Sequence, residues 1–291
     1  MKLTVLSYAD VSAENINSLR RAAETLGVEI QELEPHRLSL WLDGGHRRVL
    51  LDGRPFTPDA VLHRTVARLM GVIAPVLHTW AEGRTVVLND PTSSLVSRDK
   101  LATARALSLA SIPYVPSLGL FADSEVLLPS RDLIRVTKPA LGLRGEDVHL
   151  HADTPAAQSF IRALRPSTSH MVAQPLMGLP GSDIRAYIVG GRCVGLMTRT
   201  AKRGEFRANI AQGGTGSTLS NTHPAAILAE RAVTALGLDF AGVDIVDDHG
   251  LLRVLEVDAW AGFAALEQVT GVDIASKIIQ LYLTELGSHR V

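Results

Sequence analysis

Two carboxylates stand on alternate positions near the C-terminus of the chain, in the stretch LEVDAWAGF at residues 255–263. In an extended strand, residues i and i+2 point to the same face, so Glu256 and Asp258 lie side by side. A third carboxylate, Asp244, ends the apolar run FAGVD, and two adjacent antiparallel strands would bring all three together. Because like charges repel, this arrangement indicates a cation, and oxygen ligands suit Mg²⁺ or Mn²⁺, which bridge to substrate phosphates. Three solvated acids at strand ends explain the spacing equally well.

A lysine at the end of a strand marks a second candidate site, in the stretch VTKPALGLRGEDV at residues 136–148. The loop after Lys138 contains Gly142 and Gly145, and its backbone N–H groups can approach phosphate oxygens together with the lysine ammonium. The stretch therefore offers a phosphate-binding loop, although a solvated lysine beside a surface loop has the same local pattern.

The residues before position 89 alternate between strand-like and helical patterns. Apolar runs predict strands at 2–7, 47–51, 59–63 and 85–89, and helical spacing predicts helices at 13–27 and 66–80. Alternation of this kind is typical of a small α/β layer, so we expect a first domain over residues 1–88.

The middle of the chain begins with a change of composition at NDPTSSLVSRDK, residues 89–100, which predicts a linker. Ser97 is a good N-cap, so we expect a helix near 98–110. Strands at 133–139, 148–151 and 171–176 and a helix at 155–164 follow. We assign the second domain to residues 89–172.

The remaining residues, 173–291, form the third predicted domain. Paired strands at 182–190 and 192–200 turn at Gly190-Gly191, and a Gly-rich loop follows at 211–217. A helix at 224–236, strands at 240–247 and 251–258, and a terminal helix from Asp273 complete the chain. The last two strands carry the three carboxylates.

Composition excludes several classes of protein. The 29 basic and 30 acidic residues give a net charge of −1, which offers no electrostatic basis for binding nucleic acid. The single cysteine, Cys193, excludes an internal disulfide framework and fits a reducing compartment. The chain starts without a signal-peptide pattern and has no apolar stretch as long as a membrane span. We therefore expect a cytoplasmic protein, and we expect it to form a homo-oligomer.

The motifs together resemble those of the ATP-grasp superfamily, and within it the RimK-type α-L-glutamate ligases and their relatives in lysine biosynthesis. The resemblance covers nearly the whole chain and is densest after Ser97. SRDKL, TKP, GSDIRAYIVGG, AKRGEFRANI, AGVDI, LEV and TGVDIA occur in the family's order and at its spacings. Several motifs at consistent intervals are far more specific than any one of them.

The resemblance implies an α/β protein with a three-domain ATP-grasp fold, in which the central and C-terminal domains clamp ATP. It also implies an enzyme that forms an acyl phosphate from a carboxylate and ATP, after which an amine attacks to give an amide, ADP and phosphate. The implied cofactors are ATP and Mg²⁺ or Mn²⁺, with two metal ions.

The family's functional residues can be carried over by position. The phosphates would be bound by Lys100, Lys138, Gly142 and Gly145, and the rest of the nucleotide would meet Gln174 and Pro175 at a hinge and Asp183 in the DIR motif. Arg207 and Asn209 of FRAN would line the γ-phosphate and the acyl end. Lys202, in the longer stretch AKRGEFRANI, is a further catalytic candidate. Asp244, Glu256 and Asp258 would hold the metal ions.

The chain also departs from the family pattern. Asp258 replaces the usual Asn and still offers an oxygen ligand, whereas residues 260–262 are Trp-Ala-Gly in place of Ser-Pro-Gly. Residues 211–212 are Ala-Gln where the glutamate ligases carry a His-Arg pair. Losing two basic residues beside the cleft argues against glutamate as the added amino acid, unless another arginine such as Arg64 or Arg199 supplies the charge.

Two alternatives stay open. A ligase that acts on the C-terminal glutamate of a carrier protein would use the same site on a larger substrate. A nucleotide-binding protein without ligase activity would bind ATP and release no ADP. The expected partners are small-molecule amino acid and carboxylate substrates, with a carrier protein as the alternative, and neither nucleic acid nor membrane.

Overall fold

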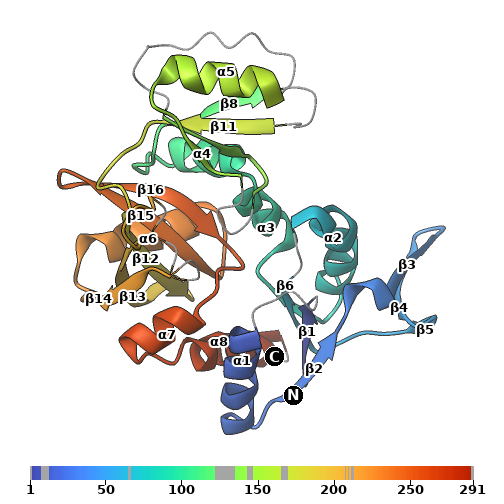
Figure 1. Cartoon of the computed structure of the whole chain (residues 1–291). Helices are drawn as coiled ribbons and strands as arrows, with labels where there is room; N and C mark the ends of the chain where they lie inside the picture. The colour runs from blue at the N-terminus through green and yellow to red at the C-terminus, as the bar shows by residue number, and fades with distance from the viewer. Residues whose placement is uncertain are drawn as a thin grey trace.

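The computed structural model of the chain describes residues 2–7, 13–64, 67–121, 135–142, 147–164, 170–206, 208, 210 and 213–289. Within these residues, four β-sheets and their helices form an α/β architecture (Figure 1). A small sheet stands above a larger one, and a parallel sheet lies beside them. The predicted α/β class is confirmed. None of the described helices is long and apolar enough to cross a membrane.

The N-terminal part is built on a parallel sheet with the strand order β2-β1-β6-β7. The strands are β1 (Lys2–Ser7), β2 (Glu29–Leu33), β6 (Ala60–Arg64) and β7 (Val86–Leu88), and α1 (Ala13–Thr25) and α2 (Ala67–Ala81) are its helices. Every residue of β6 is buried, as expected for a parallel strand covered on both faces. This burial takes Arg64, the last residue of β6, out of solvent.

A three-stranded antiparallel sheet extends from this layer and projects from the right-hand side of Figure 1. Its strands are β3 (Leu38–Asp43), β4 (His46–Leu51) and β5 (Arg54–Pro55), and the 3₁₀ turn η1 (Pro35–Arg37) leads into β3. Only the strand at 47–51 is predicted from the sequence.

The C-terminal part is an antiparallel sheet with the order β14-β13-β12-β15-β16. Its strands are β12 (Ser182–Val189), β13 (Arg192–Thr200), β14 (Thr215–Thr218), β15 (Phe240–Asp248) and β16 (Leu251–Asp258), and its helices are α6 (Pro224–Ala235), α7 (Ala264–Thr270) and α8 (Ile274–His289). Along β12, Ile184, Ala186 and Ile188 pack in the core with α6, while Tyr187 and Val189 pack in the core with α1 and α8. This alternation buries both faces of the strand.

The small sheet has the order β10-β9-β11-β8 and is antiparallel. Its elements are β8 (Leu118–Phe121), β9 (Val136–Pro139), β10 (His149–Leu150), α5 (Thr154–Leu164) and β11 (His170–Gln174), and α3 (Pro91–Arg98) and α4 (Lys100–Leu109) lead into it. Ala157 and Ile161 of α5 pack on Leu120, Met171 and Ala173 to form a separate core.

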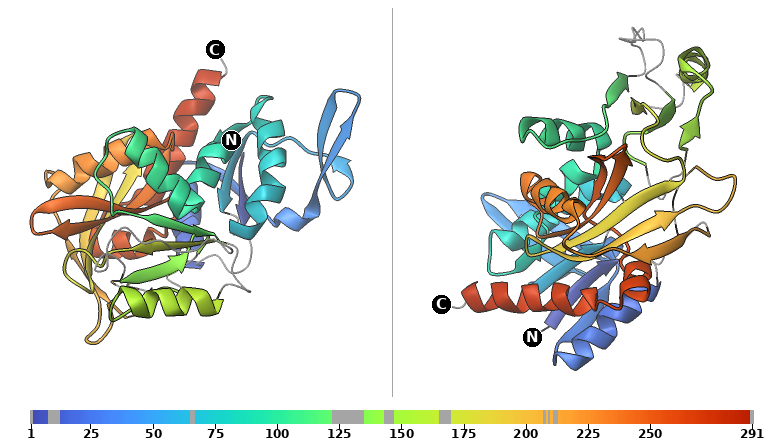
Figure 2. Two further views of the ribbon diagram at one scale, coloured as in Figure 1. Left: turned by 90° about the horizontal axis from the view of Figure 1, so that it is seen from above. Right: turned by 90° about the vertical axis from the view of Figure 1, so that its left-hand side faces the viewer.

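The two ends of the chain share one core. Apolar residues of β1, α1 and β6 belong to the same buried cluster as those of β12 and α8, and α8 lies beside α1 (Figure 2). Asn15 Oδ1 accepts hydrogen bonds from the backbone N–H groups of residues 263 and 264, each at 2.9 Å. The Tyr282 hydroxyl of α8 donates to the Val61 carbonyl at 2.8 Å. The parallel and five-stranded sheets are therefore joined into one packed body.

The segment predicted as a linker, residues 89–100, instead contains a helix. Pro91 is the first residue of α3, where its missing N–H costs nothing, and Asp90 is the N-cap. The Asp90 carboxylate accepts from the Ser93 N–H at 2.7 Å. Asp and Ser residues at helix ends are also common in loops, which is why composition alone suggests a linker.

The predicted N-cap of the following helix is wrong as well. Asp99 caps α4 and accepts from the Leu101 N–H at 2.8 Å, while the Ser97 hydroxyl donates to the Ser94 carbonyl inside α3. The predicted Gly-rich loop at 211–217 also ends early, because β14 begins at Thr215 and pairs with β13. The domain boundaries after residues 88 and 172 stay predictions.

Candidate active site

The register of β15 and β16 places Asp244 directly opposite Glu256, as the sequence predicts. The register shifts beside Asp244, so Leu255 has no partner on β15. Such a bulge re-aims the side chains that follow it. Val254 and Val257 are both buried, whereas Glu256 between them is partly exposed. The bulge thus keeps the strand in the core and turns its carboxylate toward the small sheet, where Lys138 lies.

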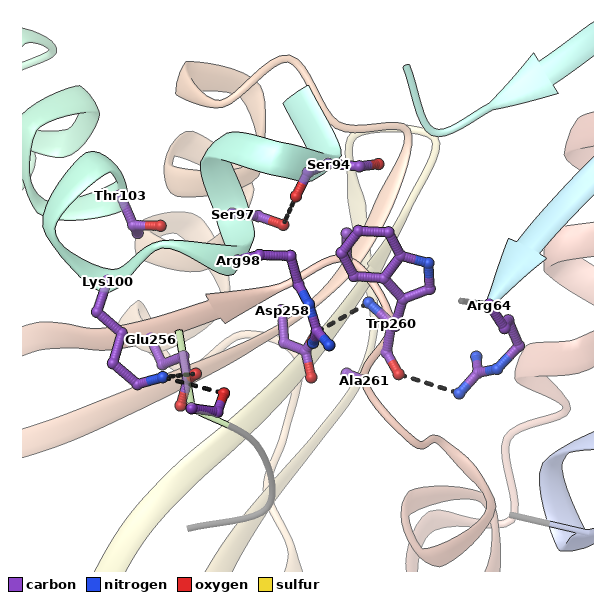
Figure 3. A network of polar contacts seen from close by, with 12 residues as sticks. Arg64, Ser94, Ser97, Arg98, Lys100, Thr103, Glu256, Asp258, Trp260 and Ala261 are labelled. Atoms are coloured by element: carbon purple, nitrogen blue, oxygen red, sulfur yellow. Dashed lines mark hydrogen bonds and ion pairs between the residues drawn. The ribbon is translucent and has the colours of Figure 1, made fainter. Parts of the chain in front are cut away.

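Each of the three predicted metal ligands has a cationic partner. Asp244 pairs with Arg185 and Arg199. Glu256 pairs with Lys100, and Asp258 with Arg98 (Figure 3). Among the described residues, no three Asp, Glu, His or Cys side chains are grouped so that they could hold a metal ion. A metal ion bound to these carboxylates would have to share them with the cations or displace the cations.

A buried group of four charged residues fixes one end of the five-stranded sheet. Arg199 stands opposite Asp183 in the register and binds it through two nitrogens, each 2.6 Å from an oxygen. Arg185 stands opposite Asp244 and also binds it through two nitrogens. Burial opposes ionisation of Asp244, but the two arginines outweigh it and lower the pKa of its carboxyl to about 2. Burial and the nearby Asp244 instead raise the pKa of Asp183.

Two lysines lie near Glu256. Lys100, at the start of α4, places Nζ 3.3 Å from Glu256 Oε1 and 3.4 Å from the Gly142 carbonyl oxygen. Lys138, on β9, is buried and has no ion pair within the described part of the chain. Burial lowers the pKa of Lys138 to about 8, and Glu256 offsets part of that effect. Burial raises the pKa of Glu256, yet the two lysines bring it below its usual value.

A pocket lies beside Lys100 and Glu256, between α4, the small sheet and β16. Its apolar lining comes from Ala104, Leu107, Tyr114, Val115, Val254 and Leu255. The cavity volume is about 10 Å³, which is room for one water molecule. Gln174 lines the polar side and donates from Nε2 to Ser117 Oγ at 2.8 Å. Pro175 follows β11 directly, where the chain leaves the small sheet.

The loop after β16 is held by Trp260. Its indole Nε1 donates to the His63 carbonyl at 2.6 Å, and its ring meets the His63 imidazole edge-on, with centroids 5.5 Å apart. The Arg98 guanidinium lies 4.7 Å from the Trp260 ring centroid, within cation–π range. The backbone N–H of Trp260 donates to Asp258 Oδ1 at 2.9 Å, and Arg64 donates to the Trp260 carbonyl at 3.0 Å (Figure 3). Trp260 thus connects β6, α3 and β16.

The remaining predicted site residues lie at the margin of this region or outside the described residues. Lys202 is exposed on a turn after β13, where its carbonyl accepts from the Glu205 N–H at 3.1 Å. Gly145, Arg207 and Asn209 lie outside the described residues, and their roles stay predictions.

Sequence reasoning misses two of the cations in this region. Arg98 and Arg185 are not predicted, although Arg185 stands two residues from Asp183 on a predicted strand, which is the available signal. The described region holds six cationic side chains and four carboxylates, a net charge of +2. The cations are Arg64, Arg98, Lys100, Lys138, Arg185 and Arg199, and the carboxylates are those of Asp183, Asp244, Glu256 and Asp258. Such a balance suits a polyanionic ligand.

Solved structures with the same architecture define the class of protein. The ATP-grasp ligase PsnB, solved with a minimal precursor, Mg and ADP, matches with a TM-score of 0.71 at 20% identity, covering 98% of each chain. D-cycloserine synthetase DcsG matches with a TM-score of 0.72 at 19% identity, covering 98% of this chain and 100% of that one. The chain has the ATP-grasp fold.

Sequence relatives narrow the class to one family. Residues 98–282 match the RimK-like ATP-grasp domain. The chain is 31% identical to a probable alpha-L-glutamate ligase of Mannheimia succiniciproducens, covering 96% of this chain and 97% of the relative. It is 32% identical to one of Serratia proteamaculans, covering 99% and 97%. The chain belongs to the RimK-like ATP-grasp family and is a ligase of the kind that forms carbon–nitrogen bonds.

Proposed function

We propose that the protein is an ATP- and Mg²⁺-dependent carboxylate–amine ligase that joins an amino acid to a carboxylate through an acyl phosphate. The observation that carries the proposal is the group formed by Lys138, Lys100, Glu256 and Asp244 where the small sheet meets the large one. Lys138 stands on the small sheet, Lys100 starts α4, and the carboxylates stand on the five-stranded sheet, so a ligand that binds all of them joins these parts.

The pocket beside Lys100 and Glu256 is the proposed adenine site. Its walls are largely apolar, Lys100 and Glu256 line its polar end, and Gln174 and Pro175 stand at the hinge of the small sheet. A volume of about 10 Å³ is far too small for a purine, so the small sheet must move away from β16 to admit the base. The triphosphate would then extend toward Lys100 and Lys138.

The carboxylates Asp244, Glu256 and Asp258 fit a metal-binding role chemically, because hard oxygen donors are what Mg²⁺ prefers. Among the described residues, only Lys100 pairs with Glu256, at 3.3 Å, so the oxygens of Glu256 are the least committed of the three carboxylates. When bound, the metal neutralises phosphate charge and orients the γ-phosphoryl group. On the family pattern, Asp244, Glu256 and Asp258 would hold two such ions.

The cations of the site would bind the phosphates of ATP once the metal ions bind the carboxylates. Lys100 would leave Glu256 for one phosphate oxygen, and Lys138, which has no ion pair among the described residues, would bind a second phosphate oxygen. Arg185 and Arg199 stay on the Asp183–Asp244 pair, hold both carboxylates in place and lower the pKa of Asp244. Arg207 and Asn209 are assigned to the acyl phosphate on the family pattern, and Lys202 remains a further candidate.

The acceptor is proposed to be a free amino acid, and a peptide or carrier protein is the second candidate. The observation that favours the second is that the structural neighbour PsnB is complexed with a precursor peptide. The two candidates differ in the size of the product, so the same assay separates them.

The test is a screen of amino-acid and carboxylate pairs by ADP release, with each product identified by mass spectrometry. The expected result is an amide whose formation requires ATP and Mg²⁺ and is lost in Glu256→Gln. A nucleotide-binding protein without ligase activity would bind ATP by calorimetry and give no amide with any pair. That outcome would overturn the proposal.

A further inference from the structure

Arg64 is a buried cation without an ionic partner in the described part of the chain. It is 7% exposed, it makes no ion pair, and its Nε has no hydrogen-bond partner. Its neighbours in the described residues are uncharged: Nη2 donates to the Trp260 carbonyl at 3.0 Å, the guanidinium lies 5.9 Å from the Phe263 ring centroid, and the Tyr187 hydroxyl is close by. A buried guanidinium held by neutral groups alone is costly, so the site fits an anion that the described residues do not supply.

A second buried arginine, on the other side of Trp260, is only weakly paired. Arg98 lies with its guanidinium over the indole, its side chain is 9% exposed, and its Nε also lacks a partner among the described residues. The one ion pair of Arg98 within the described part of the chain is with Asp258 Oδ1 at 3.5 Å, which is longer than a good charge-assisted hydrogen bond. Two arginines therefore face one carboxylate, and Figure 3 shows them flanking the indole.

The other arginines of the site are already satisfied. Arg199 binds Asp183 through two nitrogens and also reaches Asp244, and Arg185 binds Asp244. Of the two arginines that could replace the missing basic pair at 211–212, Arg199 is thus bound to carboxylates, whereas Arg64 has no ion pair among the described residues. Burial lowers the pKa of Arg64 from its usual value, yet a guanidinium remains charged at neutral pH.

We infer that Arg64, assisted by Arg98, binds a carboxylate of the amino-acid substrate that does not take part in the reaction. The inference rests on the proposed function, because it names a feature of that reaction's acceptor. A guanidinium can bind a carboxylate with two parallel N–H···O bonds, and the unpaired Nε atoms offer donors for it. The Trp260 ring supplies an apolar wall between the two arginines.

The carboxylate can come from the α-position or from an acidic side chain. The expectation drawn from residues 211–212, that the acceptor carries no free acidic side chain, then no longer follows. The side-chain carboxylate of an acidic amino acid would be an anionic partner for Arg64.

The test measures binding by calorimetry to the full chain with Mg²⁺ and a non-hydrolysable ATP analogue. The probes are the twenty L-amino acids. Each amino acid that binds is then tested as its α-amide, and each acidic one also as its side-chain amide. In the wild type, amidation of the recognised carboxylate should weaken binding about 10- to 100-fold, as expected for a hydrogen bond to a charged group. The amide that loses affinity identifies which carboxylate is bound.

Arg64→Gln should bind acid and amide alike, with nucleotide affinity unchanged as the control for folding. Arg64→Lys keeps the charge but not the bidentate geometry and should recover part of the preference. Arg47→Gln, at an exposed arginine paired with Glu82, is the matched control and should behave as wild type.

A purely structural role for Arg64 gives different results. Arg64→Gln would then keep the preference for acid over amide while its melting temperature falls. That result, or a wild type that binds no amino acid or binds acids and amides equally, overturns the inference. Failure of the proposed function is recognised separately, as absence of ATP binding or of ADP release by the wild type.

Discussion

The two large sheets and the small sheet differ in how they are held. The parallel and five-stranded sheets share cores that join the two ends of the chain, and buried polar side chains such as Asn15 and Tyr282 cross between them. The small sheet has its own core, with five buried residues among those described. Because buried apolar area is the main stabilising term, the small sheet is the part that can move at the lowest cost in free energy.

The proposed site lies at a seam between a rigid part and a movable one. The carboxylates, with Arg185 and Arg199, stand on the rigid sheet, whereas Lys138 and Gln174 belong to the small sheet. A clamp of this kind lets the nucleotide enter when the seam is open and excludes water when it is closed.

The largest expected effect tests the rigid side. Glu256→Gln should lower turnover by about 10³-fold or more, because it removes the charge that holds the metal ions, and added Mg²⁺ should restore little. Asp258→Asn keeps one oxygen ligand and should retain substantial activity. Turnover of both variants against Mg²⁺ concentration is the measurement. An active Glu256→Gln beside an inactive Asp258→Asn would show that the metal ligands are assigned wrongly.

A pair of core truncations tests whether the two parts differ in stability. Leu62→Ala, in the shared core, should lower the free energy of unfolding by about 2–5 kcal/mol. Met171→Ala, in the small core, should leave the main transition nearly unchanged and loosen only the small sheet. The chain has three tryptophans, Trp41, Trp80 and Trp260, and none lies in the small sheet, so urea unfolding by tryptophan fluorescence follows the large part. Equal shifts of that transition would argue for a single cooperative unit.

A glycine on the rigid side sets the position of the Trp260 loop. A Cβ added to Gly242 on β15 would lie 2.4 Å from the Ala261 Cβ, which forces the loop away from the sheet. Gly242→Ala should therefore cost about 1–3 kcal/mol of stability and weaken amino-acid binding more than ATP binding. Thermal melting and calorimetry with each ligand provide the measurements. Gly71→Ala, in α2, is the control, because an added Cβ there meets nothing within 4 Å and the helical backbone accepts alanine. If nucleotide affinity fell more than amino-acid affinity, the loop would belong to the ATP site instead.

The smallest expected effect concerns pH and the movable side. Neutral Lys138 predominates above about pH 8, so ATP affinity of the wild type should fall above that pH, by at most about tenfold per unit. Lys138→Arg, which stays charged, should remove this dependence. Calorimetry from pH 7 to 9.5 is the measurement, and a pH profile unchanged in Lys138→Arg would exclude Lys138 as its cause.

Stability should respond to pH in the opposite direction. The pKa of Lys138 is about 8 in the folded protein and 10.5 in the unfolded chain, so the unfolded state binds more protons between these values. The contribution of this residue to the free energy of unfolding therefore rises with pH across that window. Between about pH 8 and pH 10.5, the stability of the ligand-free protein should therefore rise while the affinity for ATP falls. Observing both trends would confirm both predictions.

Elements with strong local patterns could be predicted from the sequence, and the site only in part. The alternation of apolar residues predicts β15 and β16 and hence the meeting of Asp244 with Glu256. The ion pairs of these carboxylates could not be predicted, because Arg98, Arg185 and Lys100 reach them only through the folded arrangement. Pairing of this kind depends on strand register and helix placement, which local periodicity does not determine.

The interlocked ends of the chain have a consequence for its synthesis. The ribosome synthesises the parallel sheet first and α8 last. Yet α8 carries the Tyr282 hydroxyl that donates to the Val61 carbonyl, and its apolar face completes the core of that sheet. Until α8 leaves the ribosome, β1 and β6 present uncovered apolar surface, so the nascent first half depends on chaperones or on delayed collapse. Removing α8 should accordingly leave the N-terminal sheet insoluble, although that helix stands more than two hundred residues away in the sequence.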